Sequence, residues 1–124
     1  MMDERCMIMD IQLGVVEARF ADIIWSNEPV TSSELVKKAK EELGWARTTT
    51  HTVVRRLCDK GLFVNESGTV RAIISRDDFY SQQCKQYIED TFDGSLPKFL
   101  AAFTRGKKLS QEEADEIRRM IDNM

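Results

Sequence analysis

The chain has 124 residues, of which 42% are hydrophobic and 31% are charged. This composition is typical of a globular protein and excludes a disordered one, and the length fits one domain or a small domain with an appendage. No run approaches the roughly 18 apolar residues of a membrane span, and the acidic N-terminal segment lacks the apolar core of a secretory signal. We therefore expect a cytoplasmic protein that makes no contact with a membrane.

Few residues are suited to metal, cofactor or catalytic chemistry. Cys6, Cys58 and Cys84 are far apart and form no CxxC or CxC pair, and His51 is the only histidine. We therefore expect no metal site and no cofactor. The sequence has no nucleophile–base pair and no phosphate loop, which predicts that the protein is not an enzyme. Two readings of the cysteines stay open: reduced thiols in or near the core, or a redox sensor at Cys58.

The first half of the chain predicts a short strand and three helices. The strand covers residues 11–13, and the first helix, residues 14–26, has apolar side chains at i, i+4, i+7 and i+8. The second helix, residues 31–43, opens on a capping-box pattern and stops at a glycine. The third helix, residues 48–60, also ends in a basic turn followed by glycine.

A β-hairpin is predicted directly after the third helix. Its two runs, residues 62–64 and 69–74, are joined by a turn rich in Asn, Ser and Gly. Three helices followed by a hairpin are the arrangement of a winged helix-turn-helix, which we assign to residues 1–76. The remaining residues, 77–124, predict only helices, over 79–92, 96–103 and 111–123. The predicted fold class is mainly α with a small β-hairpin wing, completed by a C-terminal helical dimerisation arm.

The third helix has the composition of a DNA-reading helix. The net charge is −3, yet between Arg47 and Arg76 six basic residues stand against two acidic ones, so this window is +4 (6 − 2). In helix-turn-helix proteins the helix after the turn enters the major groove, where short polar side chains and arginines contact bases and phosphates. A wing arginine can hold a neighbouring phosphate. The predicted DNA-binding residues are Arg47, Thr48, Thr49, His51, Thr52, Arg55, Arg56 and Arg71.

The same residues resemble a known family, the BlaI/MecI/CopY repressors, also called penicillinase repressors. The resemblance begins near Leu13 and extends past the wing into the final helix. Its order and spacing make it fairly specific. The matching motifs are Ile23-Ile24-Trp25, Thr49-x-x-Thr52, Arg56-Leu57, Lys60-Gly61-Leu62 and the apolar run 99–103.

The resemblance implies a homodimeric repressor that binds a palindromic operator in double-stranded DNA. The resemblance also implies that Thr49, His51 and Thr52 face bases and that Arg56 holds phosphate. The family dimerises through its C-terminal helices. Symmetry gives the physical reason, since two recognition helices must lie about a helical turn apart to read two half-sites.

The C-terminal helices carry more large apolar residues than short helices without a sheet can cover. They leave an exposed patch unless a partner covers it, which predicts dimerisation. The alternative is that they fold back on the same chain. The predicted dimerisation residues are Phe92, Leu96, Phe99, Leu100, Phe103, Ile117, Met120 and Ile121.

Three positions depart from the family pattern. Thr50 stands where the family has valine or isoleucine, which predicts looser helix packing there. The penicillin-responsive members are cleaved by a regulatory protease between asparagine and phenylalanine, and the corresponding pair here is Ala102-Phe103. The copper-responsive members end in cysteine pairs, and this chain does not. The resemblance therefore does not imply cleavage at Ala102-Phe103, a regulatory protease stays open as a further partner, and copper sensing is not expected.

A second functional class is compatible with the net acidic charge. It is a winged-helix protein-interaction module that does not read DNA. The two hypotheses differ in the salt dependence of DNA binding, because phosphate contacts weaken steeply as salt rises.

Overall fold

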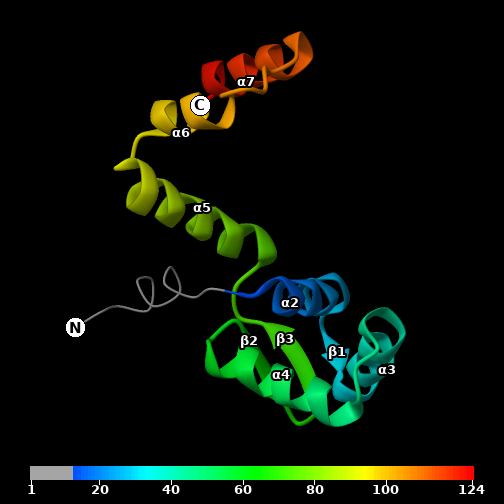
Figure 1. The fold of residues 1–124 in the computed structure, drawn as a ribbon. Coiled ribbons are helices and arrows are strands. Elements are labelled where there is room, and N and C mark those ends of the chain that lie inside the picture. The colour runs from blue at the N-terminus through cyan, green and yellow to red at the C-terminus, as the bar shows by residue number, and fades with distance from the viewer. Residues whose placement is uncertain (1–12) are drawn as a thin grey trace, which may run out of the picture. The chain divides into compact units, whose positions relative to one another are not determined.

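The computed structural model describes residues 13–124, which form six helices and one three-stranded antiparallel sheet (Figure 1). The predicted fold class, mainly helical with a small sheet, is confirmed. The helices are α2 (Val15–Asn27), α3 (Ser32–Leu43), α4 (Arg47–Asp59), α5 (Arg76–Phe92), α6 (Leu96–Phe103) and α7 (Gln111–Asp122), and the strands are β1 (Val30–Thr31), β2 (Phe63–Glu66) and β3 (Thr69–Ala72). The strand expected over residues 11–13 lies outside the described residues, apart from Leu13, which is in neither a helix nor a strand.

Local sequence fixes both ends of α3. The Thr31 hydroxyl accepts a hydrogen bond from the Glu34 backbone N–H at 3.2 Å, as an N-cap does. Gly44 ends the helix in the left-handed conformation, with φ of 68°, and its N–H donates to the Lys40 carbonyl at 3.1 Å. Only residues 44–46 then separate α3 from α4, so the two helices form the helix-turn-helix.

The sheet combines the predicted hairpin with a strand that the sequence did not reveal. β2 and β3 pair in antiparallel fashion, and their turn at Ser67 and Gly68 has φ values of 53° and 89°, as a type I′ turn requires. β1 pairs with the other edge of β3, with Val30 opposite Val70. A two-residue strand is too short to leave an alternating pattern, so only its tertiary partner identifies it.

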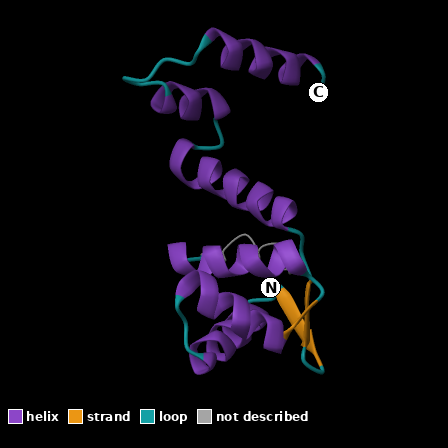
Figure 2. Ribbon diagram, turned by 90° about the vertical axis from the view of Figure 1, so that its right-hand side faces the viewer, coloured by secondary structure: helices purple, strands orange, loops and turns teal. Residues whose placement is uncertain are grey.

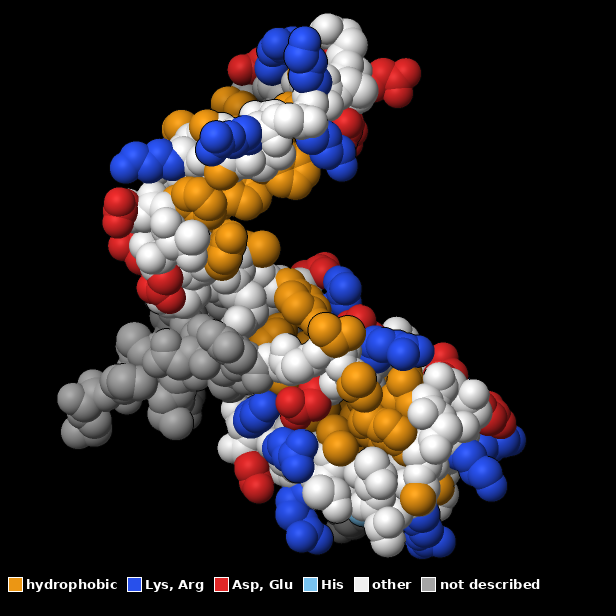
Figure 3. Space-filling view, viewed as in Figure 1, with side chains coloured by type: hydrophobic (Ala, Val, Ile, Leu, Met, Phe, Trp, Pro, Cys, Tyr) orange, Lys and Arg blue, Asp and Glu red, His pale blue; other side chains and the backbone are white. Residues whose placement is uncertain are grey.

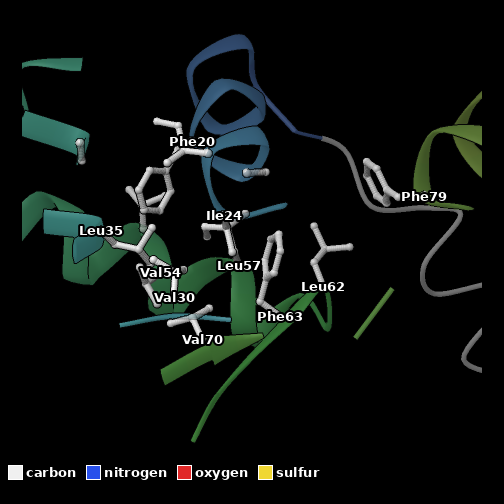
Figure 4. Close-up of a cluster of buried hydrophobic side chains, with 14 residues drawn as sticks. Phe20, Ile24, Val30, Leu35, Val54, Leu57, Leu62, Phe63, Val70 and Phe79 are labelled. Atoms are coloured by element: carbon white, nitrogen blue, oxygen red, sulfur yellow. The ribbon is translucent and has the colours of Figure 1, made fainter. Parts of the chain in front are cut away.

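One hydrophobic core joins the first three helices to the sheet, which lies at one edge of the helices in Figure 2. Helices α2, α3 and α4 and both hairpin strands contribute to it, and Figure 4 shows their side chains converging. Burial of such side chains stabilises the fold by about 1.5–3 kcal/mol each. The largest fully buried apolar residues are Phe20, Ile24, Val30, Leu35, Leu57, Leu62, Phe63, Val70 and Phe79, the last of which comes from α5.

The chain divides into two compact units between Gln86 and Tyr87. This division lies further along the chain than the boundary expected at residues 76–77. Phe79 is 2% exposed within the first core and Tyr80 packs against that core, so the first turns of α5 belong to the first unit. We call residues 13–86 the head and residues 87–124 the arm. α5 therefore begins in the head and ends in the arm.

Turn residues and caps separate the helices of the arm. Asp93 and Gly94 adopt φ values of 53° and 76°, which end α5. The Ser95 hydroxyl then caps α6, accepting from the Lys98 N–H at 3.2 Å. Ser110 begins α7 with a complete capping box. Its hydroxyl accepts from the Glu113 backbone N–H, and the Glu113 side chain accepts from the Ser110 backbone N–H.

Candidate nucleic-acid interface

Helix α4 is held by one buried face. Val53, Val54 and Leu57 point into the core together with Thr50, which is 1% exposed. The Thr50 hydroxyl donates to the Ala46 carbonyl at 3.3 Å, so its buried polar atom has a partner. The polar residue at this position is therefore buried with its hydroxyl hydrogen-bonded, and looser packing around it stays a prediction.

The turn before α4 is anchored to α2 as well. The Trp45 ring lies 5.0 Å from the Phe20 ring, centroid to centroid, and Phe20 is fully buried. The backbone N–H of Trp45 also donates to the Ala39 carbonyl at 3.3 Å. Because the turn is fixed at both α2 and α3, the start of α4 has a defined position on the surface.

The face of α4 opposite the core carries a row of polar side chains. Thr48, Thr52 and Arg55 follow one another at i, i+4 and i+7, and all three are exposed. The Thr52 hydroxyl donates to the Thr48 carbonyl at 2.9 Å. Its proton is therefore used within the helix, and the side chain offers an acceptor oxygen and a methyl group to a ligand.

A second row, Thr49 and Arg56, lies seven residues apart on the flank of α4 that faces α2. Arg56 Nη1 lies 3.9 Å from the Glu17 carboxylate, and Lys60 Nζ lies 3.5 Å from the same oxygen. The Arg56 side chain is still 54% exposed. The residue predicted to hold phosphate is thus accessible, but it has an acidic neighbour that comes from α2.

The opposite flank of α4 faces the start of α3. His51 is half-buried, whereas Arg47 is exposed. Both line a pocket with Ser32, Ser33 and Val36 of α3. The structure therefore brings the predicted His51 and Arg47 together with two α3 hydroxyl residues that the sequence analysis did not single out.

The wing arginine is exposed and forms an ion pair within the hairpin. Arg71 on β3 pairs with Glu66 on β2. Asn65 stabilises the turn beside them, its side-chain oxygen accepting from the Gly68 N–H at 2.9 Å. The wing therefore presents a balanced pair of charges rather than an isolated cation.

Tertiary structure lowers the positive charge that the sequence window indicated. Carboxylates of α2, which lie outside that window, approach its cations: Glu17 approaches Arg56 and Lys60, and Asp22 binds Arg76. Within residues 13–124, Arg47 and Arg55 are the members of the window with no carboxylate within 4.0 Å. Figure 3 shows this mixture of basic and acidic side chains on the head.

The cysteines have different environments. Cys58 is half-buried on α4, and burial followed by the charge of Asp59 raises the pKa of its thiol. A raised pKa keeps the group protonated at neutral pH, and the thiolate is the reactive form. Cys84 is exposed rather than near the core, and Cys6 lies outside the described residues. Residues 13–124 contain no group of three His, Cys, Asp or Glu side chains arranged for a metal ion.

The predicted dimerisation residues form an aromatic row in the arm. The ring centroids of Phe92 and Phe99 are 5.7 Å apart, and those of Phe99 and Phe103 are 6.0 Å apart. Tyr87, which the sequence analysis missed, extends the row at 5.8 Å from Phe92. These contacts do not bury the residues. Leu96, Phe103, Met120 and Ile121 are 51–56% exposed, while Phe92, Phe99, Leu100 and Ile117 are half-buried.

Helices α2, α3 and α4 followed by the β2–β3 hairpin define a winged helix-turn-helix. The outward threonines and Arg55 lie on α4, the helix after the turn. The fold and the site together therefore belong to the class of winged-helix transcription regulators.

Comparison with known proteins places the chain within this class. Residues 13–123 match the penicillinase repressor family, so the chain belongs to that family, which is a family of transcriptional repressors and not of enzymes. It is 21% identical over 115 residues to the methicillin resistance regulatory protein MecI of Staphylococcus aureus strain Mu50, covering 90% of this chain and 94% of the relative. It is 23% identical over 115 residues to the penicillinase repressor of Bacillus licheniformis, covering 90% of each.

The resemblance seen in the sequence motifs is thus confirmed at the level of the family. Among residues 13–124, no helix combines the length and the apolar character needed to cross a membrane.

Proposed function

We propose that the protein is a homodimeric repressor that reads a palindromic operator through α4. The observation that supports this most directly is the outward row of Thr48, Thr52 and Arg55, set on a helix whose other face is locked in the core. Short polar side chains and an arginine on a protruding helix suit the major groove. Thr49 on one flank of α4, and Arg47 and His51 on the other, extend this DNA-reading surface. Arg56 and Arg71 contact the DNA phosphates once these displace the carboxylates of Glu17 and Glu66.

The arm supports the homodimer. None of the side chains of residues 87–124 is buried, although this segment contains several large apolar residues. Figure 3 shows hydrophobic side chains gathered along its helices. A monomer rarely exposes such a surface, and a second copy with the same surface covers it through a twofold axis. The same axis relates two α4 helices, which makes the operator palindromic.

The decisive experiment is selection of bound duplexes from a random pool, followed by gel-shift titration at 50 and 200 mM salt. The proposal expects inverted repeats and a steep loss of affinity with salt. Binding that ignores sequence, or no binding at either salt concentration, would favour the alternative function as a protein-interaction module.

Two substitutions at Thr52 test base reading. Thr52→Val keeps the methyl group and removes the hydroxyl oxygen, whereas Thr52→Ser keeps the oxygen and removes the methyl group. The first variant should lose preference for a base with an exposed amino group, and the second for thymine. Unchanged selection by both variants would show that Thr52 does not face a base.

A regulatory protease is the remaining partner in the proposal. The bond between Ala102 and Phe103 lies in the last turn of α6, and both side chains are exposed. Mass spectrometry of the repressor recovered from induced and uninduced cells tests it. Fragments that end at Ala102 and begin at Phe103 only after induction would support cleavage, and an intact chain in both samples would contradict it.

A further inference from the structure

Side-chain contacts hold the first turn of α5 against α2 on the surface of the head. Arg76 Nε donates to the Asp22 carboxylate at 2.8 Å, and the Arg76 guanidinium lies 4.9 Å from the centre of the Tyr80 ring. The hydrogen bond to Asp22 raises the pKa of Arg76, and Tyr80 also has a raised pKa because it is partly buried. The arginine therefore stays charged, and the tyrosine stays neutral, at physiological pH.

An aromatic cluster adjoins these contacts, with Phe63 and Phe79 buried and Trp25 and Tyr80 partly buried. The Trp25 ring is 5.7 Å from Phe79 and 6.0 Å from Tyr80, both on α5, and 5.1 Å from Phe63 of β2. Trp25 Nε1 also donates to the Ile74 carbonyl at 3.0 Å, just before α5 begins. One tryptophan near the end of α2 therefore contacts the wing, the residue that leads into α5 and the first turn of α5.

The chain passes from head to arm within α5, because this helix runs from Arg76 to Phe92 and the division falls between Gln86 and Tyr87. Any coupling between a DNA-reading head and a pairing arm along the chain must therefore pass through α5. The contacts of Asp22, Trp25, Arg76 and Tyr80 hold the start of α5 against the head. We name these four residues the α5 clasp.

We propose that the α5 clasp sets the half-site separation that the dimer accepts in its operator. This inference rests on the proposed function as a dimeric repressor. Each added base pair moves one half-site by about 3.4 Å along the duplex and by about a tenth of a turn around it. A head that is fixed on α5 fits few separations, whereas a head that is free to swing fits several. The clasp residues are positioning residues, since none of them lies on α4.

The test measures binding to duplexes that carry two copies of the selected half-site at separations varied in steps of one base pair. A duplex with a single half-site reports the intrinsic affinity of the head, and sedimentation reports dimerisation. The variants are Arg76→Ala, which removes the pair with Asp22, and Trp25→Phe, which keeps an aromatic ring but removes the N–H that binds the Ile74 carbonyl. Arg19→Ala is the matched control, because it removes the same charge from exposed α2 surface outside the clasp.

We expect the preference for the best separation over its neighbours to fall about two- to fivefold in Arg76→Ala, in line with an exposed ion pair. The fall should be about fivefold or more in Trp25→Phe, which leaves a carbonyl unpaired. Single half-site affinity, dimerisation and the Arg19→Ala control should stay at wild-type values. Arg76→Lys, which keeps the charge beside Asp22, should recover part of the preference.

The results separate this inference from the proposed function. If wild type is a dimer with a sharp separation preference and both variants retain it, the clasp has no such role, although the repressor function stands. If wild type shows no separation preference, both the palindromic dimer and this inference fail. A loss of single half-site affinity in both Arg76→Ala and Trp25→Phe would overturn the inference too, because the clasp would then act on the reading surface itself.

Discussion

The head and the arm use hydrophobic residues in opposite ways. The head buries Phe20, Leu35, Leu57 and Phe63 almost completely between helices and sheet. The arm has aromatic residues of similar size, yet none of its side chains is buried, and Phe103 is 51% exposed. The difference arises because the head has two packed layers and the arm has helices alone. The head packs helices on a sheet, whereas short helices alone present more apolar surface than they can cover.

This contrast indicates that the head and the arm differ in the source of the apolar burial that stabilises them. The head has its own core and is expected to fold without a partner, whereas the proposed pairing with a second copy is expected to supply most of the burial of the arm. Two predictions test this contrast, and two more test the charged surface of the head.

The largest effect is expected in the head core. Phe20→Ala should lower the free energy of unfolding by about 3–5 kcal/mol, because it leaves a cavity at a fully buried site. Chemical denaturation followed by circular dichroism measures it. Phe103→Ala at high dilution is the matched comparison and should cost less than about 1 kcal/mol, as a half-exposed side chain does. Equal costs would mean that the arm has a core of its own.

The next effect concerns pairing of the arm. Phe103→Asp should weaken self-association roughly thirtyfold or more, because it places a charge where an aromatic anchor is proposed to be covered. Analytical ultracentrifugation measures the dissociation constant, and thermal unfolding of the head at dilution should not change. Lys98→Glu puts an acidic residue elsewhere on the same helix as a control. Similar losses in both variants would point to charge rather than to a buried Phe103.

A smaller effect separates the two neighbouring arginines on the reading surface of the head. Arg55→Ala should weaken operator binding roughly five- to hundredfold, since Arg55 has no carboxylate within 4.0 Å among residues 13–124. Arg56→Ala should weaken binding less and equally for all sequences, because Arg56 already has Glu17 beside it. Gel-shift titrations on operator and scrambled duplexes measure both losses, and a larger loss for Arg56 would reverse this ranking.

The smallest effect comes from the carboxylate on α2. Glu17→Gln should raise DNA affinity about two- to fivefold, because removing a charge beside Arg56 and Lys60 frees them for phosphate. The plot of log affinity against log salt should also become steeper. Glu34→Gln removes an acidic charge from exposed α3 as a control. Weaker binding by Glu17→Gln would show that the carboxylate orients the two cations for DNA.

Much of the fold could be predicted from residue patterns, because its helices have strong local signals. The capped start of α3 and its stop at Gly44 appear as sequence motifs, and so does the turn of the wing. The outward position of Thr48, Thr52 and Arg55 also follows from helical periodicity. β1 is too short to be recognised in the sequence. The first compact unit extends past the expected boundary at residues 76–77 because Phe79 joins the first core.

The sequence by itself determined the class of protein and the position of the helix that is proposed to meet DNA, since caps, periodicity and turn residues act over a few neighbours. Only the tertiary structure decided which cations keep their charge unopposed. Glu17 and Asp22 lie far from the basic window in the chain but approach it in space. Charge interactions depend on distance in three dimensions, so a count along the sequence overstates the positive field of this surface.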